Sequence, residues 1–528
     1  MRPQARTKGQ GFLPGIVTAC LLALAMPGHV GWWPLLAVAL VPLLLAVRAS
    51  TPGRSARIGF VCGLLYHLSL LYWILIVLGR YGGLPLWLSL PALFLLAAYM
   101  ACFPALFCAL LSLVAGPGRQ RERSVDLMVW AAPVFWVGLE YLRGFFLSGF
   151  PWMDLGYGLF GQPRLIQAAD LGGHHLLSFC LVLCNSLVVG LLICQGRSGR
   201  RVPRREPALL ALAAILLLVI GGYSQARYQQ VADQLPGVPQ SRVAVVQGNI
   251  DQAMKWSKET KEATVAQYIR LSATVVKEPR PDLVVWPETA LPFYPQRDAL
   301  VARLFDFTVA NQAWLLTGAP LFTPTQGADG DGQGQFFNGA LLIGPAGQVG
   351  GTHAKQHLVP FGEYVPLRRF LPFLEPLVVS VGDFTAGTSV APLVLGPMRL
   401  GMLICYESIF PDISHQAVTH GANLLVNLTN DAWYGRSSAP DQSLAMAVLR
   451  AVETKRSLIR AANTGISGFV DPLGRITART AIFTEAALVS PVAMLDQLTF
   501  FSRYGYRFGA LCLLLIPLLV ALRLWRGR

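Results

Sequence analysis

The stretch Leu-Gly-Met-Leu-Ile-Cys-Tyr-Glu-Ser, residues 400–408, places two reactive side chains directly after a short apolar run. A run of apolar residues and glycine that gives way to polar residues is typical of a buried strand. Cys405 and Glu407 stand where that strand should end. In a layered α/β fold, side chains at strand ends converge on a common crevice. The stretch therefore predicts such a fold, with a site at the end of this strand.

Two further strand ends in the same part of the chain carry reactive side chains. Glu288 follows Leu-Val-Val-Trp-Pro at 283–287, and Lys355 stands in His-Ala-Lys-Gln-His at 353–357. From residue 241 onward, strand-like runs and helical patterns together predict an α/β layered domain of about 260 residues, enough to bury a core. The strand-like runs are 243–246, 283–285, 315–317, 340–343, 400–404 and 424–427, and the helical patterns are 259–277, 297–312, 411–420 and 441–460.

Glu288, Lys355 and Cys405 are the side chains that thiol-based acyl chemistry requires. An unperturbed thiol is mostly protonated at neutral pH, so a carboxylate must take its proton before it can attack. A lysine ammonium can then stabilise the oxyanion that forms on the attacked carbonyl. Taken singly, such a glutamate or lysine is usually solvated, and such a cysteine usually lies in a core. Their joint occurrence favours covalent catalysis.

The composition of the chain indicates a membrane protein. Of its 528 residues, 54% are hydrophobic and 13% are charged, whereas soluble domains carry about 25% charged residues. A membrane-crossing helix needs roughly 20 mostly apolar residues. Eight spans are predicted, near residues 11–27, 30–47, 57–79, 84–115, 126–143, 172–195, 207–224 and 507–525.

The positive charges predict how these spans are oriented. A net charge of +15 is compatible with nucleic-acid binding, but the arginines cluster between apolar runs, which is typical of cytoplasmic loops. Basic clusters at 48–57, 117–125 and 196–206 alternate with sparsely charged connections. Seven crossings then place residues 225–505 outside the cytoplasm. No nucleic-acid partner is therefore expected.

Three domains follow from this layout, a membrane domain at 1–224, an α/β domain at 225–495, and an eighth span with a cytoplasmic tail at 496–528. The first apolar run has an alternative interpretation as a signal peptide, with a cleavage site near Ala23-Leu-Ala25. Cleavage there would leave the sidedness of the later segments unchanged.

Two segments have interpretations that the sequence leaves open. The aromatic-rich residues 144–171 are either an interfacial belt or a lateral entrance for lipid. Just before them, Glu140 and Arg143 either pair with each other or meet a lipid headgroup. Residues 366–378, apolar and basic together, are either an interfacial arm over the active site or a packed surface loop.

Three motifs resemble a known enzyme superfamily. Val-Trp-Pro-Glu-Thr at 285–289, Lys-Gln-His-Leu-Val-Pro-Phe-Gly-Glu-Tyr-Val-Pro at 355–366 and Ile-Cys-Tyr-Glu-Ser at 404–408 resemble the Glu-Lys-Cys triad of the nitrilase superfamily. The second and third resemble the apolipoprotein N-acyltransferase family in particular. The resemblance covers most of residues 225–490 and implies an αββα catalytic domain beside a bundle of eight transmembrane helices.

The resemblance implies a role for each residue of the triad. Glu288 is the general base, Lys355 stabilises the oxyanion and Cys405 is the nucleophile. The resemblance also implies supporting residues. These are Glu363, which orients Lys355 and the base; Glu407, which shapes the site near the thiol; Tyr406, which contacts the acyl carbonyl or only packs; Trp256, which lies near the entrance or only packs; and the motif 427–435, which borders the pocket or is simply a turn.

The same resemblance implies a reaction in the bacterial inner membrane, with the catalytic domain in the periplasm. A phospholipid, typically phosphatidylethanolamine, donates an acyl chain to Cys405, and the α-amine of S-diacylglyceryl-cysteine in an apolipoprotein accepts it. No soluble cofactor or metal is required. His353 and His357 flank Lys355 without a third ligand, so no metal site is expected there.

Two other functions fit parts of the sequence. A membrane-anchored amidase or nitrile hydrolase would use the same triad with water as acceptor, although eight spans exceed what anchoring needs. A non-catalytic lipid transporter should carry ionisable residues at the bilayer midplane, whereas the predicted spans are nearly free of them apart from positions such as His67.

Overall fold

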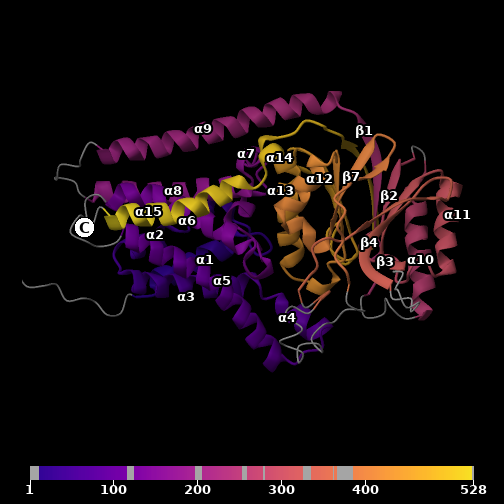
Figure 1. The fold of residues 1–528 in the computed structure, drawn as a ribbon, viewed down its shortest axis with the longest axis horizontal. Helices are drawn as coiled ribbons and strands as arrows, with labels where there is room; N and C mark the ends of the chain where they lie inside the picture. The colour runs from indigo at the N-terminus through magenta and orange to yellow at the C-terminus, as the bar shows by residue number, and fades with distance from the viewer. Residues whose placement is uncertain are drawn as a thin grey trace, which may run out of the picture. The chain divides into compact units, whose positions relative to one another are not determined.

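A computed structural model of the chain divides into two compact units (Figure 1). The helical unit is Met1–Leu75, Leu86–Ala226 and Tyr506–Arg528, and the sandwich unit is Ile76–Pro85 and Arg227–Gly505. The structure describes residues 11–115, 124–196, 205–251, 258–277, 280–324, 334–360, 362–364 and 384–525. The short segment Ile76–Pro85 belongs with the sandwich unit although it lies between two apolar helices in the sequence.

The helical unit consists of apolar helices joined by short turns. Prolines stand in the first turn of several of these helices, where the missing backbone N–H is not needed by the helix. The elements are α1 (Leu13–Ala25), η1 (Trp33–Ala37), α2 (Val41–Arg48), α3 (Pro52–Leu70), α4 (Ile74–Ile76), α5 (Leu86–Ala115), α6 (Ser124–Arg143), η4 (Phe146–Ser148), η5 (Leu155–Leu159), α7 (Ala169–Gly172), α8 (His174–Gln195), α9 (Arg205–Gln234) and α15 (Arg507–Trp525).

Four helices among the described residues are long and apolar enough to cross a membrane, namely α5, α8, α9 and α15. A fifth span results if α3 and the segment Ile74–Tyr81, bent by 56° from it, are taken together. Helix α1 has 13 residues and is therefore about 20 Å long, less than the bilayer core of about 30 Å. The structure thus supports four or five of the eight predicted spans by length and composition, and the count of eight stays a prediction.

The sandwich unit contains two six-stranded sheets, in the orders β12-β1-β2-β3-β4-β5 and β11-β10-β9-β8-β7-β6. The strands are β1 (Gln240–Gln247), β2 (Leu283–Val285), β3 (Trp314–Pro324), β4 (Gly334–Ile343), β5 (Val349–Ala354), β6 (Leu393–Leu395), β7 (Met398–Ile404), β8 (Leu424–Thr429), β9 (Ser457–Ala462), β10 (Gly468–Val470), β11 (Ile476–Arg479) and β12 (Ala486–Ala493). The helices are α10 (Lys258–Ala273), α11 (Ala302–Asn311), α12 (Pro411–Thr419), α13 (Ala439–Thr454) and α14 (Phe500–Tyr504), with the short turns η2 (Val77–Tyr81), η6 (Leu235–Gly237), η7 (Ala299–Val301), η9 (Cys405–Ile409) and η10 (Ala432–Tyr434).

Each sheet is built around three parallel strands, β1-β2-β3 in one and β7-β8-β9 in the other. Each outer strand pairs antiparallel to its neighbour in the sheet. Helices α10 and α11 cover one side of the sandwich, and α12 and α13 lie on the other (Figure 1). This is the four-layered αββα arrangement that the family resemblance implies.

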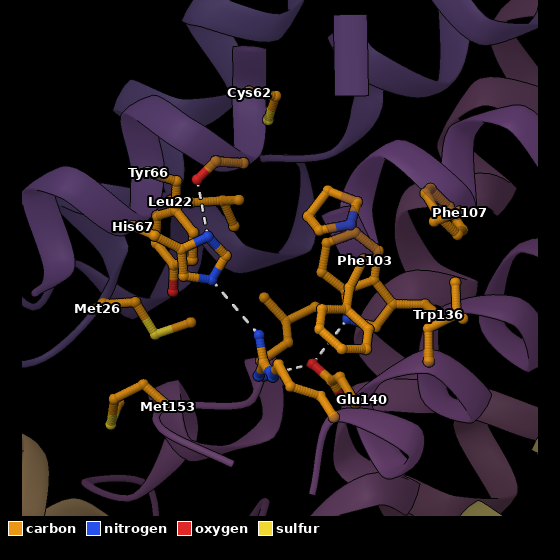
Figure 2. Close-up of a pocket in the computed structure, with 15 residues that line it drawn as sticks. Leu22, Met26, Cys62, Tyr66, His67, Phe103, Phe107, Trp136, Glu140 and Met153 are labelled. Atoms are coloured by element: carbon orange, nitrogen blue, oxygen red, sulfur yellow. Dashed lines mark hydrogen bonds between the residues drawn. The ribbon is translucent and has the colours of Figure 1, made fainter. Parts of the chain in front are cut away.

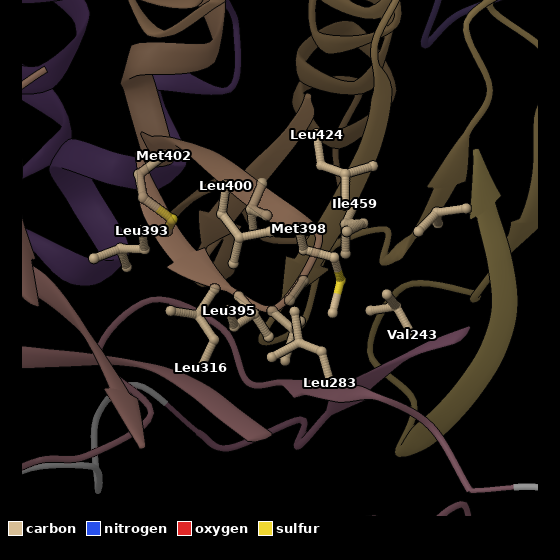
Figure 3. Close-up of a cluster of buried hydrophobic side chains, with 14 of the residues drawn as sticks. Val243, Leu283, Leu316, Leu393, Leu395, Met398, Leu400, Met402, Leu424 and Ile459 are labelled. Atoms are coloured by element: carbon tan, nitrogen blue, oxygen red, sulfur yellow. The ribbon is translucent and has the colours of Figure 1, made fainter. Parts of the chain in front are cut away.

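Side-chain alternation along the strands creates two separate cores. Val243 and Val245 of β1 point between the sheets, with Leu283 and Leu400 among their companions (Figure 3). The intervening Ala244 instead joins the cluster formed with α10 and α11. Successive side chains of a strand point to opposite faces of the sheet. A strand that is covered on both faces therefore needs apolar residues at odd and at even positions alike.

One predicted helix is partly wrong. The pattern at 441–460 was expected to be helical throughout, but α13 ends at Thr454 and β9 begins at Ser457. Lys455 adopts a left-handed conformation, with φ of 51°, and this breaks the helix. The apolar residues of β9 fit a buried strand as well as they fit a helix, so periodicity alone did not separate the two.

Replacing Leu400 by Ala should destabilise the sandwich unit by about 2–5 kcal/mol, because the side chain is fully buried between the sheets and leaves a cavity. Val394→Ala on the adjacent strand is the matched control, since Val394 is 56% exposed and should change stability by no more than about 0.5 kcal/mol. Thermal unfolding of the full chain in detergent measures both. Equal shifts in the two variants would contradict the inter-sheet core.

Candidate active site

Cys405 lies in a tight turn directly after β7. Its backbone is left-handed, with φ of 55°, a conformation that costs a non-glycine residue about 1–3 kcal/mol and persists only where surrounding contacts enforce it. Asn427 supplies such contacts, because its Nδ2 donates to the Leu403 carbonyl at 2.8 Å and to the Cys405 carbonyl at 3.4 Å. The turn leaves Cys405 partly exposed at the strand end.

Glu288 follows β2 in a second strained turn, with Thr289 at φ of 48°. The Glu288 side chain is buried and accepts two hydrogen bonds, from Asn338 Nδ2 at 2.8 Å and from the Asn430 backbone N–H at 3.0 Å. The turn rests against Gly318 of β3, whose N–H donates to the Pro287 carbonyl at 3.1 Å. These contacts fix the direction of the carboxylate.

Lys355 comes directly after β5 and forms a buried ion pair with Glu363. Its Nζ lies 3.0 Å from Oε1 and 2.9 Å from Oε2 of Glu363. Asn338 Nδ2 also donates to Glu363 Oε1, at 2.7 Å, so this one amide joins Glu363 to Glu288. Glu288, Asn338, Glu363 and Lys355 therefore form one continuous hydrogen-bonded group.

The electrostatics of the site keep Cys405 protonated at rest. Burial raises the pKa of the Cys405 thiol well above its ordinary value, and Glu288 raises it further, while Lys355 and Thr429 lower it. Burial lowers the pKa of Lys355, but Glu363, Cys405 and Glu288 more than reverse this effect, so the net pKa is raised. A neutral thiol and a cationic amine are thus the resting forms, and the thiol needs a base before it can react.

Glu407 joins the turn of Cys405 to the loop that follows Lys355. Its carboxylate accepts backbone hydrogen bonds from Ile404 and Gln356, both at 2.6 Å, and from His357 at 3.0 Å. Burial raises the pKa of Glu407 to about 7, against the lowering effect of these N–H donors and of Lys355. Glu407 therefore connects two of the three strand ends without contacting the thiol through any of these bonds.

The other predicted supporting residues fare differently. Tyr406 is buried and stacks edge-on against Phe410, with ring centroids 5.0 Å apart, and His357 lies against the same phenylalanine at 4.0 Å. Trp256 and the predicted arm at 366–378 lie outside the described residues.

The motif at 427–435 contacts the segment Ile76–Pro85. Tyr81 packs edge-on against Trp433 at 5.5 Å, and Gly435 lies so close to Ile76 that an added Cβ would approach that side chain to 3.0 Å. Residues 76–79 were expected to end a membrane span, and the structure instead groups them with the sandwich unit. Because the chain bends by 56° after α3, this segment does not continue along the axis of that helix.

Two residues of the site were missed from the sequence. Asn338 stands inside β4, and Arg460 lies in β9, where it contacts Asp431 of the predicted motif at 427–435. The only sequence signal for Asn338 is an amide in an otherwise apolar strand, and a polar residue of that kind is usually edge-exposed. Its role depends on pairing between strands, which one sequence does not reveal.

The helical unit contains a buried polar cluster that sequence reasoning also missed. Asp154 pairs with Arg143 and with His174, whose Nε2 lies 2.8 Å from the carboxylate, and His175 lies 3.4 Å from it. The sequence left open whether Arg143 pairs with Glu140 or meets a lipid headgroup. In the structure it pairs with Asp154 instead. The carboxylate and the two imidazoles lie within metal-binding reach of one another, but Arg143 already supplies the positive charge that balances Asp154.

A cavity of about 40 Å³ adjoins this cluster within the helical unit (Figure 2). Its lining is mostly apolar and includes the polar side chains of His67, Glu140 and Arg143. Glu140 accepts from Trp136 Nε1 at 2.7 Å and from the Leu155 N–H at 2.8 Å. These polar groups are held by protein partners, so the strand ends of the sandwich unit remain the better candidate for chemistry.

Two family models match the chain. The apolipoprotein N-acyltransferase N-terminal domain matches residues 18–187, and the carbon-nitrogen hydrolase family matches residues 242–494. Among solved structures, the C. elegans NitFhit protein aligns with a TM-score of 0.38 and 18% identity, over 48% of this chain and 61% of that chain.

Curated relatives match over nearly the whole chain. An apolipoprotein N-acyltransferase of Geobacter metallireducens is 41% identical, over 95% of this chain and 93% of the relative. Those of Azotobacter vinelandii and Pseudomonas putida are each 34% identical, covering 98% and 92% of this chain and 96% and 91% of the relatives.

Replacing Gly318 by Ala should displace Glu288, because the added Cβ would lie 2.5 Å from the Pro287 carbonyl oxygen and 2.6 Å from the Glu288 Cα. A misplacement of about 1 Å can cost roughly 100-fold in rate, so we expect a loss of that order in acyl transfer. Gly344→Ala is the matched control, since its Cβ would meet only the flexible end of Gln348. Full activity in Gly318→Ala would show that the reaction does not depend on the position that Gly318 gives to Glu288.

Proposed function

The chain belongs to the apolipoprotein N-acyltransferase family and N-acylates lipoproteins, and we propose that it does so through a thioester on Cys405. The observation that carries this proposal is the continuous group of Glu288, Asn338, Glu363 and Lys355 beside the turn of Cys405. Together with Cys405, this group supplies a base, a cation and a nucleophile at the ends of β2, β5 and β7.

The first half-reaction charges the enzyme. Glu288 takes the proton of the Cys405 thiol, and the thiolate attacks the ester carbonyl of a phospholipid. The Lys355 ammonium stabilises the oxyanion. The carbon–oxygen bond then breaks, the leaving lysophospholipid oxygen takes the proton back from Glu288, and the acyl chain remains on sulfur as a thioester.

The second half-reaction transfers the acyl chain. The neutral α-amine of the lipoprotein's S-diacylglyceryl-cysteine attacks the thioester carbonyl, and Lys355 again stabilises the oxyanion. Glu288 takes a proton from the attacking nitrogen and passes it to the sulfur as the carbon–sulfur bond breaks. An amide forms, and the thiol is restored in its resting form.

The raised pKa of Cys405 supports a role for a general base in both halves. A cysteine that was already a thiolate would need no base for attack, but it would also be a weaker nucleophile and a better leaving group. In this mechanism, Glu288 removes the thiol proton as the sulfur attacks the carbonyl. The sulfur therefore becomes a strong nucleophile only when a substrate is bound.

Lipid substrates account for the helical unit. Both the acyl donor, which we take to be phosphatidylethanolamine, and the lipidated acceptor are confined to a membrane. We propose eight crossings in the bacterial inner membrane, a membrane domain at 1–224, a periplasmic catalytic domain at 225–495 and a last span from 496 onward. The alternation of basic and sparsely charged connections supports this sidedness.

Incubation of the purified full chain with phosphatidylethanolamine should add one acyl mass to the peptide that contains Cys405. Cys405→Ser should form no hydroxylamine-labile adduct, because an ester on serine resists the neutral hydroxylamine that cleaves a thioester. Glu288→Gln and Lys355→Ala should fold but charge at least about 100-fold more slowly. Intact-protein mass spectrometry measures the adduct.

Addition of a diacylated lipopeptide should then discharge the enzyme and yield a triacylated product. Release of free fatty acid instead would indicate the hydrolase that the sequence left open. Charging of Cys405→Ala by labelled phospholipid would refute the nucleophile assignment.

The orientation is tested by alkaline phosphatase, which folds actively only outside the cytoplasm. A fusion after Gly237, beyond α9, should be active, whereas a fusion after Gly196, beyond α8, should be inactive. The reverse pattern would place the catalytic domain in the cytoplasm and overturn the proposed localisation.

A further inference from the structure

A fully buried arginine stands behind the turn of the nucleophile. Arg460 lies on β9, directly beside Asn427 of β8 in the parallel register. Its Nε donates to the Ile466 carbonyl at 3.1 Å, and its Nη1 donates to Asn427 Oδ1. Its Nη2 donates to Asp431 Oδ2 at 2.8 Å and to Ser443 Oγ at 3.1 Å. Every nitrogen of the guanidinium therefore has a protein partner.

One chain of contacts runs from Arg460 through Asn427 to the backbone of Cys405. Because Arg460 occupies the Asn427 carbonyl oxygen, the asparagine amide can orient only its Nδ2 toward β7. That Nδ2 donates to the Leu403 and Cys405 carbonyls, at 2.8 and 3.4 Å. These two carbonyls flank the left-handed peptide of Cys405. Arg460 thus decides which end of the amide faces the strained turn.

A second chain of contacts runs through Asp431. Its Oδ2 receives Arg460, and its Oδ1 accepts from the Thr429 hydroxyl at 2.7 Å. Asp431 is itself held in a left-handed conformation, with φ of 49°. Gly465 packs against it so closely that any added Cβ would clash with the carboxylate. Thr429 is also one of the residues that lower the pKa of the Cys405 thiol.

A buried arginine is costly unless its charge is paired and all its donors are satisfied. Arg460 meets both conditions, because Asp431 pairs with its charge and Asn427 accepts one of its hydrogen bonds. Both partners must keep their positions for this to hold. The arrangement is therefore specific: loss of the arginine leaves a buried carboxylate unpaired and frees the Asn427 amide to turn over.

We propose that Arg460 is a positioning residue for the nucleophile, holding the turn of Cys405 through Asn427 and orienting the Thr429 hydroxyl through Asp431. Arg460 contacts none of the reacting atoms. Its loss should therefore slow the chemical step and leave lipid binding unchanged. This inference rests on the proposed role of Cys405 as the acyl carrier.

The test compares Arg460→Gln with Arg456→Gln in the full-length protein. Arg456 is also buried, stands one residue before β9 and donates to backbone carbonyls among the described residues, including those of Ala422 and Gln497. It is therefore a control for the general loss of a buried arginine. Asn427→Asp is a second variant, because it keeps an acceptor for Arg460 but removes the donor to the Cys405 turn.

In Arg460→Gln and Asn427→Asp, the rate of thioester formation at saturating phospholipid should fall by about 10- to 100-fold, with KM for the phospholipid unchanged. Arg456→Gln should lower the melting temperature to a similar extent and keep the wild-type rate. Equal rate losses in Arg456→Gln would show a stability effect and overturn the proposal, as would a wild-type rate in a folded Arg460→Gln.

Alkylation of Cys405 by iodoacetamide, followed across pH, separates this proposal from the proposed function. Asp431 raises the pKa of Cys405, and Arg460 neutralises Asp431, so Arg460→Gln should move the alkylation profile to higher pH. Arg456→Gln should leave the profile in place. If the wild-type chain carried no acyl group on Cys405, the proposed thioester would be refuted. An unshifted alkylation profile in Arg460→Gln would refute the role of Arg460 whether or not Cys405 carries an acyl group.

Discussion

The site depends on burying several charges at one place, where each must be paired. Lys355 and the carboxylates of Glu288 and Glu363 are all less than a tenth exposed, and an isolated charge at that depth would cost several kcal/mol. Asn338 makes the burial possible, because one amide nitrogen satisfies an oxygen of each carboxylate. The residues after β2 and β5 must both lie beside Asn338 inside β4 for this to happen. A shift in the pairing of these strands would therefore leave a charge of the site without its partner.

The turns after β2 and β7, which carry Glu288 and Cys405, both contain a strained backbone conformation. Cys405 and Thr289 are left-handed, and neither is a glycine. Each turn is held from behind by groups of the neighbouring strand, Asn427 beside Cys405 and Gly318 beside Glu288. The strained turns place a thiol and a carboxylate at the ends of strands from different sheets, and Glu288 lies near enough to raise the pKa of Cys405. If either strand continued without a turn, its side chains would go on alternating between the two faces of the sheet. The thiol or the carboxylate could then point into a hydrophobic core.

The sequence predicted the parts of this arrangement that are local in the chain. The strand ends at Glu288 and Cys405, the six strand-like runs and most of the helices could be read from apolar runs followed by polar residues. Asn338 and Arg460 could not, because their roles arise from which strands pair. The helix expected at 441–460 overran into β9 because a short buried strand and a buried helix share one composition. The helical cluster of Asp154, His174 and His175 was missed because its members are 20 residues apart or more, apart from the adjacent histidines.

The raised pKa of Cys405 bears on how the acyl chain leaves the thioester. In the proposed second half-reaction, the Cys405 sulfur leaves readily only as a neutral thiol, so a proton must reach it as the carbon–sulfur bond breaks. The environment that raises the thiol pKa makes the free thiolate a poor leaving group. An attacking amine brings its own proton, which Glu288 can relay to the sulfur. Water brings a proton too, but it is a weaker nucleophile than an amine held beside the thioester. In the proposed mechanism, the greater nucleophilicity of the held amine, rather than the electrostatics of the thiol, therefore favours the lipoprotein over water.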